Sequence, residues 1–197
     1  MLLADVSVIV ATVLAVASLI PQIGKLWSTK DPTGVSITWP ALGLVTNVGW
    51  TAYLYHQRLW LSVPSAALMV IFYGVILILL ARVGQRLWAG AARGLAWGIT
   101  LSAIGVVGGW LILGVVLGTS AAIQVVPAIW TAFRTYAPSG ISPGTWWIIL
   151  AEAALWGAYG TAYEDVAIII FAITASATAL LMLARFYATR HRFAPVT

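Results

Sequence analysis

Two stretches of this chain repeat each other and decide its fold: residues 18–36 read SLIPQIGKLWSTKDPTGVS, and residues 124–142 read QVVPAIWTAFRTYAPSGIS. An ungapped shift of 106 positions superimposes them. The identical pairs are Pro21 and Pro127, Ile23 and Ile129, Thr29 and Thr135, Pro32 and Pro138, Gly34 and Gly140, and Ser36 and Ser142. The same shift pairs Trp50 with Trp156 and Tyr53 with Tyr159. So many matches at one offset predict a duplicated structural unit.

The composition places this duplicated unit in a membrane. Of 197 residues, 62% are hydrophobic and 8% are charged, and the mean hydropathy is +1.00. Soluble domains have about 25% charged residues. The chain therefore lacks the polar surface that water requires, and a lipid bilayer is its expected surroundings. With 0 cysteines, disulfides, thiol nucleophiles and thiolate metal sites are excluded.

The apolar stretches predict seven transmembrane helices, since about 20 apolar residues cross the hydrocarbon core. The predicted spans are 6–24, 37–55, 59–81, two within 94–133, 144–163 and 166–184. A turn at Gly118, Thr119 and Ser120 is expected to divide the 94–133 stretch. Ala15-Val16-Ala17 imitates a signal cleavage site, but no basic residue precedes this apolar run, so we expect it to be retained as a span.

These spans fit an all-α membrane protein arranged 3+1+3. The first three-helix unit covers residues 1–81, a basic loop and linker helix cover 82–117, and the second unit with a tail covers 118–197. A single linker helix restores the orientation, so the two units are parallel and a pseudo-twofold axis runs along the membrane normal. The expected place for function is a polar path between the units.

The basic residues predict the orientation. Nine of the ten lie on one side of the predicted spans, and Arg58 alone lies on the other. The positive-inside rule then puts the N-terminus outside and the C-terminus in the cytoplasm. Because the basic residues are scattered between apolar runs, nucleic acid is excluded as a partner and the lipid bilayer is expected. The charge bias and short loops suit a multi-pass protein of a cell membrane, such as a bacterial inner membrane.

The segment Ser18-Leu19-Ile20-Pro21-Gln22-Ile23, the loop Lys30-Asp31-Pro32-Thr33-Gly34-Val35-Ser36 and the segment Trp50-Thr51-Ala52-Tyr53 resemble the PQ-loop signature. With the 3+1+3 arrangement, the chain resembles the SWEET and SemiSWEET sugar transporters of that superfamily. The resemblance implies facilitated, bidirectional diffusion of a small sugar by alternating access, without a cofactor. A complete bundle in one chain is compatible with oligomerisation but does not require it.

The resemblance also implies hinges and a gate. Family members bend at one proline in the first helix and another early in the second helix of each unit, and the matching positions here are Pro21, Pro40, Pro127 and Pro143. Proline lacks an amide hydrogen, so a helix can bend there. Pro143 could instead simply start a helix. Gln22 is either a gating residue or a partner for a carbonyl that Pro21 leaves free.

Trp50 and Trp156 match positions that flank the sugar in the family. An indole ring packs on the C–H face of a sugar, and its N–H gives a directional hydrogen bond. Ordinary helix packing would also suit a tryptophan. The family usually adds an asparagine in the third helix of each unit, but Ala66 and Ala172 stand there in this chain, with Ser62, Ser65, Thr174 and Ser176 nearby.

Glu152 lies near the middle of the predicted sixth span, one turn before Trp156. An ionisable group at that depth is costly and marks a functional candidate. Its repeat partner is Thr46, beside Asn47. We expect Glu152, Asn47 and both tryptophans to converge on one substrate cavity, in which Glu152 either binds substrate or carries a proton. The alternative is a protonated carboxyl hydrogen-bonded to a neighbouring helix.

Three functions follow as hypotheses: a sugar uniporter, a proton-linked carrier of an amino acid or other polar solute that uses Glu152, and a receptor or assembly partner that does not transport. A retinal protein is excluded, because its Schiff base needs a lysine in the last span and only Lys25 and Lys30 are present. We expect no enzyme activity and no metal, because His56 and His191 lie at span edges and no catalytic set surrounds Glu152.

Overall fold

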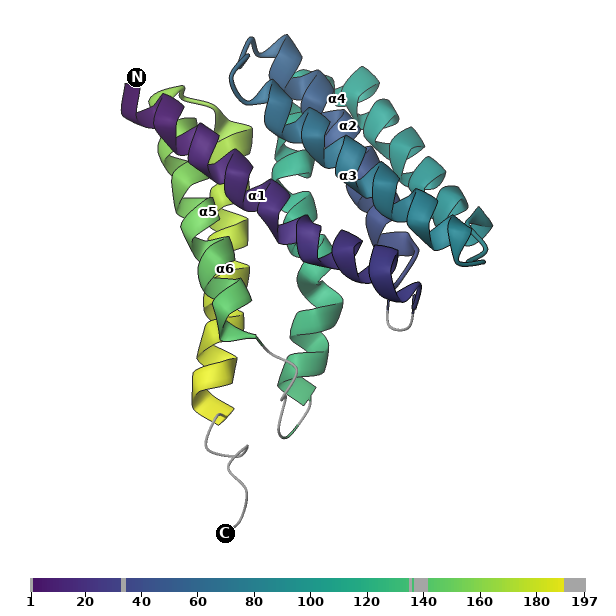
Figure 1. The fold of residues 1–197 in the computed structure, drawn as a ribbon. Helices are drawn as coiled ribbons and strands as arrows, with labels where there is room; N and C mark the ends of the chain where they lie inside the picture. The colour runs from purple at the N-terminus through teal and green to yellow at the C-terminus, as the bar shows by residue number, and fades with distance from the viewer. Residues whose placement is uncertain (1, 33–34, 135, 137–141, 190–197) are drawn as a thin grey trace.

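The structure is all-helical (Figure 1). This computed structural model describes residues 2–32, 35–134, 136 and 142–189. Within these ranges the helices are α1 (Leu2–Thr29), α2 (Thr38–His56), α3 (Val63–Arg82), α4 (Trp88–Arg134), α5 (Pro143–Ala162) and α6 (Val166–Thr189). Long apolar stretches become helices because a helix satisfies its own backbone N–H and C=O groups. The repeated loop positions Gly34, Pro138 and Gly140 lie outside the described residues.

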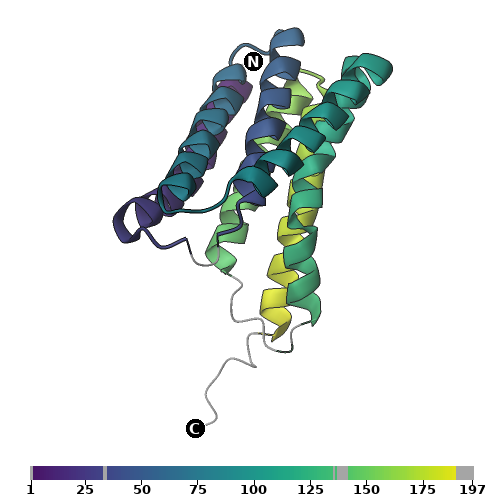
Figure 2. The same cartoon turned by 90° about the vertical axis from the view of Figure 1, so that its right-hand side faces the viewer.

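Helix α4 consists of two helices joined at Gly109, which has φ 71° and ψ −177°. Glycine adopts this conformation without a Cβ clash. The turn predicted at Gly118, Thr119 and Ser120 is wrong. These residues are helical, and the hydroxyls of Thr119 and Ser120 donate to carbonyls of the preceding turn. We call residues 88–108 the first arm of α4 and residues 110–134 the second arm; the arms meet at the bundle end where the N-terminus lies (Figure 2).

The helices have the dimensions and surface of a membrane protein. Among the described residues, α1, α3, the Trp88–Val126 part of α4, and α6 are long and apolar enough to cross a bilayer by length and composition. Large apolar side chains cover the outside of the bundle; for example, Val107 is 90% exposed. A surface of this kind is stable in lipid and not in water. The protein is therefore an all-α membrane protein that crosses the bilayer more than once.

The helices pack into a closed ring. In the described residues α1 contacts α3 and α5, α2 contacts α3 and α4, and α6 contacts α4 and α5 (Figure 1). Helix α3 therefore separates α1 from α2, and α6 separates α4 from α5. Small residues permit close approach of the helices. A Cβ at Gly118, for example, would lie 2.6 Å from the backbone oxygen of Ala167 in α6.

The apolar core is continuous at one end of the bundle and divided at the other. The first arm of α4 divides the chain into two parts, the residues before it and the residues after it. Near the N-terminus, one cluster joins Val8 and Tyr53 of the first part to Leu117, Tyr159 and Ile168 of the second. At the opposite end there are two clusters in the described residues. One contains only residues that precede the first arm of α4, such as Leu26 and Leu80, and the other only residues that follow it, such as Ala132 and Met182.

Candidate functional site

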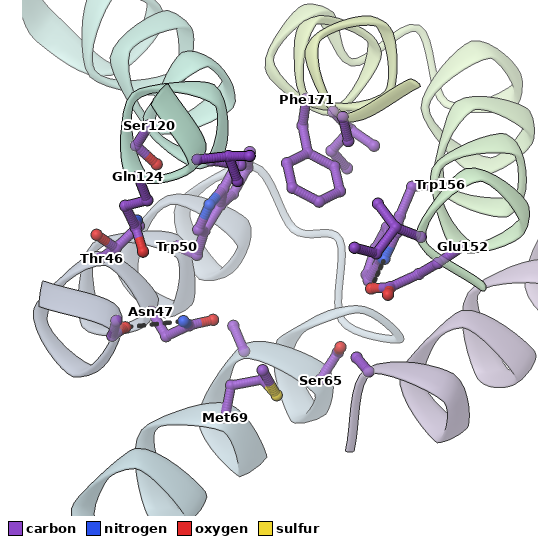
Figure 3. Close-up of a pocket in the computed structure, with 18 of the residues that line it drawn as sticks. Thr46, Asn47, Trp50, Ser65, Met69, Ser120, Gln124, Glu152, Trp156 and Phe171 are labelled. Atoms are coloured by element: carbon purple, nitrogen blue, oxygen red, sulfur yellow. Dashed lines mark hydrogen bonds between the residues drawn. The ribbon is translucent and has the colours of Figure 1, made fainter. Parts of the chain in front are cut away.

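A cavity of about 340 Å³ lies in the middle of the ring of helices (Figure 3). Residues of α1, α2, α3, the second arm of α4, α5 and α6 line it. The four residues predicted to bind substrate, Asn47, Trp50, Glu152 and Trp156, all lie in its wall. The structure therefore brings together positions that are about one hundred residues apart in the sequence. Their part in binding remains a prediction.

The two tryptophans lie on different walls of the cavity, and Phe171 of α6 lies between them (Figure 3). Its ring centroid is 6.1 Å from that of Trp50 and 6.4 Å from that of Trp156, both edge to face. Such pairs fix the ring orientations. Phe171 is not among the predicted site residues, although the sequence carries a usable signal: the 106-residue shift pairs it with Ser65, which also lines the cavity.

Glu152 contributes a carboxylate to the cavity wall. It lies one helical turn before Trp156 on α5, and the indole Nε1 of Trp156 donates to its Oε1 at 3.4 Å. This is a long hydrogen bond, because N–H···O distances are typically about 2.9–3.0 Å. Among the described residues that line the cavity, Glu152 is the only acid, and there is no lysine, arginine or histidine. Its charge therefore has no basic partner in the wall.

The wall formed by α2 is polar and neutral. Asn47 donates through Nδ2 to the carbonyl of Gly43 at 2.8 Å, which directs the amide oxygen toward the cavity (Figure 3). Thr46 is held from outside the cavity, because Trp97 in the first arm of α4 donates to its hydroxyl at 2.9 Å. Ser65 on α3 and Gln124 on the second arm of α4 add further polar groups. This wall offers hydrogen bonds without a formal charge.

The hinge and gate candidates Pro21, Gln22, Pro40 and Pro143 are not among the described residues that line the cavity. The side chain of Pro127 is outside the described part of the chain. Pro21 lies inside α1, which remains helical through it, and Gln22 beside it has a buried Nε2 atom without a hydrogen-bond partner. Pro40 is the third residue of α2, and Pro143 is the first residue of α5. Proline fits the first turn of a helix, where no amide donor is needed. Pro127 lies in the second arm of α4, and movement at these prolines stays a prediction.

Hydrogen bonds close the bundle at the end near the N-terminus. The hydroxyl of Tyr53 on α2 donates to Oδ2 of Asp165 at 2.9 Å, across 112 residues of sequence. The hydroxyl of Tyr163 donates to Oδ1 of Asp5 at 2.6 Å. This hydrogen bond, with burial, raises the pKa of Tyr163, which follows α5, to about 12, so the phenol remains a donor. Neither hydrogen bond is predicted by the sequence pattern.

The cavity extends toward the other end of the bundle. Trp39 in the first turn of α2 and Trp146 in the first turn of α5 line it there. These two residues belong to the separate apolar clusters of the two parts of the chain. The two parts are thus joined at the end near the N-terminus and packed separately at the end that the cavity approaches.

The described residues show no group of three His, Cys, Asp or Glu side chains that could hold a metal ion. The expectation that the protein uses neither metal nor cofactor remains a prediction.

Comparison with known proteins adds one finding. No curated protein matches the chain. Residues 3–63, which include α2 and nearly all of α1, match the family model described as PQ loop repeat. The matched segment contains Pro21, Gln22 and Trp50. This match supports placing the chain in the PQ-loop superfamily.

Proposed function

We propose that the protein is a membrane transporter that carries a small polar solute, in the first instance a sugar, by alternating access between two three-helix units. The observation that carries the proposal is the cavity between the two parts of the chain, with Trp50 in one wall and Trp156 in the other. The match to the PQ loop repeat supports a transporter-like role.

The packing supports two equivalent units. Under the 106-residue shift, α1 corresponds to the second arm of α4, α2 to α5, and α3 to α6. Each helix contact then has a counterpart: α1 with α3 matches α4 with α6, α2 with α3 matches α5 with α6, and α1 with α5 matches α4 with α2. We therefore propose a 3+1+3 arrangement with the first arm of α4 as linker, and a second unit that starts after Gly109 and not at residue 118.

The cavity walls support the same symmetry. Six positions in the first unit and their partners under the shift line the cavity: Ala15 with Ala121, Gly43 with Ile149, Thr46 with Glu152, Trp50 with Trp156, Ser65 with Phe171, and Met69 with Ala175. A twofold axis through the cavity would place such pairs on opposite walls. This is the arrangement expected where two rigid units rock against each other around a central site.

In this proposal the structure represents the conformation of the transporter that is closed to the outside. The hydrogen bonds from Tyr53 to Asp165 and from Tyr163 to Asp5 tie the units together at one end, and the cavity extends toward the other end. The positive-inside rule places the closed end outside and the other end in the cytoplasm of the cell. Solute would enter or leave from the cytoplasm in this state, and breaking the two hydrogen bonds would accompany opening to the outside.

A second candidate function rests on Glu152. A carboxylate in the cavity wall without a basic partner can bind a proton in one state and release it in the other. The protein would then be a proton-linked carrier of a polar solute. Neither candidate requires an enzymatic step, and we propose no catalytic residues.

The test is uptake of labelled glucose by proteoliposomes, with and without a proton gradient. The proposal expects saturable uptake that Trp156→Ala reduces strongly, because the ring forms a wall of the cavity. Trp88→Ala is the control, because the Trp88 side chain is 72% exposed on the outer surface of the bundle. This variant should transport glucose normally. Uphill accumulation that Glu152→Gln abolishes would select the proton-linked carrier. Folded protein that moves no glucose under either condition would overturn the sugar proposal.

A further inference from the structure

The cavity combines two features that a neutral solute does not explain together. The first is the carboxylate of Glu152, whose contact in the wall is the 3.4 Å hydrogen bond from Trp156. The second is the number of aromatic rings around the same space, which come from Trp39, Trp50, Tyr73, Trp146, Trp156 and Phe171. Both features lie in one cavity of about 340 Å³, so a single small solute can meet both.

A buried carboxylate is costly unless a positive charge or a proton accompanies it. The wall supplies no such charge, because the described residues of the lining include no lysine, arginine or histidine. The missing positive charge must therefore come from the solution. It can be a proton or the solute itself.

The aromatic rings favour the solute. The faces of indole, phenol and phenyl rings attract cations electrostatically, most strongly for tryptophan and where water is excluded. Phe171 is set edge to face against both Trp50 and Trp156, so the rings hold different orientations around the space. A proton on Glu152 would gain nothing from these rings, whereas an ammonium group held between them and the carboxylate would gain from both.

The rest of the lining restricts the solute further. A zwitterion such as an amino acid would bring a carboxylate of its own, and the described lining offers it no basic side chain. The lining also offers the amide of Asn47 and the side chains of Ser65 and Gln124, which are partners for hydroxyl groups. The solute that fits is positively charged at one end and hydroxylated at the other.

We propose that the solute is a small hydroxylated organic cation, such as an amino sugar or amino alcohol, whose ammonium group binds between Glu152 and the aromatic rings. The inference rests on the proposed transport function for its biological meaning. The binding preference itself can be tested without transport, so the two can fail separately.

The test compares cations with neutral molecules of the same shape. Binding of glucosamine and glucose, and of choline and 3,3-dimethylbutan-1-ol, is measured by calorimetry on the purified full chain at neutral pH. In each pair the two molecules differ chiefly in one positive charge. We expect at least one cation to bind about tenfold or more tightly than its neutral counterpart, given the usual strength of desolvated cation–π contacts.

Variants of Glu152 identify the source of the preference. Glu152→Gln keeps the shape and removes the charge, so the preference for the cation should disappear, whereas Glu152→Asp keeps the charge and should retain it. Glu164→Gln removes an acid after the end of α5 and should change nothing. The melting temperature of each variant reports whether it is folded.

The results decide between the alternatives. The inference is overturned if neither cation binds better than its neutral counterpart, or if the preference survives Glu152→Gln in folded protein. Glucose uptake without a preference for cations would leave the transport proposal standing and remove this inference. A preference for cations without uptake of glucose or glucosamine would support this inference and overturn the transport proposal.

Discussion

In the proposed two-unit arrangement, the two walls of the cavity have equivalent backbones but carry different chemistry. In the first unit, Thr46 and Ser65 are polar and neutral; their counterparts under the 106-residue shift, Glu152 and Phe171, are acidic and aromatic. Trp50 and Trp156 are the same on both sides. In this proposal the duplication accounts for the shape of the site, and the differences between the walls account for what it can bind. Substitutions that make the walls alike, or exchange them, test this interpretation directly.

The largest effect is expected from Gly43→Ile, which gives the first wall the residue found at its counterpart, Ile149. A Cβ at Gly43 would lie 2.6 Å from the ring of Tyr73, so the ring would have to leave its position in the cavity wall. Overpacking of this kind costs about 3 kcal/mol. The apparent melting temperature in detergent should fall by about 5 °C or more.

Gly24→Ala is the control for this variant, because no atom lies within 4 Å of the added Cβ, and its melting temperature should not fall. Normal stability of Gly43→Ile would mean that Tyr73 has a second position, and that the first wall is more adaptable than its close packing indicates.

The next largest effect is expected from exchanging the acid between the walls. Glu152→Thr alone should abolish the preference for glucosamine over glucose, a change of about tenfold. Adding Thr46→Glu should restore part of it, because the new carboxylate would face the same cavity and could accept the hydrogen bond that Trp97 now donates to Thr46. Calorimetry on the single and double variants measures both steps. A folded double variant without any restored preference would show that the walls are not equivalent.

A smaller effect is expected where the two proposed units meet, at the end of the bundle near the N-terminus. Tyr53→Phe removes the hydrogen bond to Asp165, at a cost to the closed state of about 1 kcal/mol, which raises the ratio of open to closed protein roughly fivefold. Since the chain has 0 cysteines, Leu54→Cys in the cavity wall provides a single labelling site. A maleimide reagent that does not cross membranes should react about fivefold faster with it from the outside in the Tyr53→Phe background.

Tyr159→Phe is the matched control, because Tyr159 is the repeat partner of Tyr53, and within the described residues its hydroxyl, unlike that of Tyr53, donates no hydrogen bond to an acid. It should leave the labelling rate nearly unchanged. Equal labelling rates in the Tyr53→Phe and Tyr159→Phe backgrounds would mean that apolar packing near Val8 and Leu117, and not the hydrogen bond to Asp165, holds this end of the bundle closed.

The sequence predicts those parts of the fold and site that depend on local composition or on the repeat. Apolar length predicts the helices, and the shift of 106 correctly pairs Trp50 with Trp156 in one cavity. It would also have located the turn in α4, because the counterpart of Leu3, at the start of α1, is Gly109. The prediction of a turn at Gly118 failed because helix packing in a membrane uses small residues in the same way that turns do.

The contacts across the units could not be predicted in this way. The hydrogen bond between Tyr53 and Asp165 joins a repeated residue to one whose counterpart is Leu59, so the repeat gives no indication of it. The place of Phe171 between the tryptophans depends on how α6 packs against α4 and α5, and single-sequence patterns do not specify such distances between helices.

The smallest effects on stability are expected at the prolines, and there the two units can be compared once more. Pro143→Ala should change the melting temperature little, corresponding to less than about 0.5 kcal/mol, because Pro143 is the first residue of α5, where no amide hydrogen is needed.

Pro21→Ala is different, because Pro21 interrupts the hydrogen-bonding pattern inside α1. Restoring an amide there should stiffen α1, so stability is kept or raised while the rate of solute exchange in proteoliposomes falls. If both variants exchange solute at the normal rate, the units do not bend at these prolines, and the movement must come from rigid rotation of one unit against the other, in which the hydrogen bonds of Tyr53 and Tyr163 break.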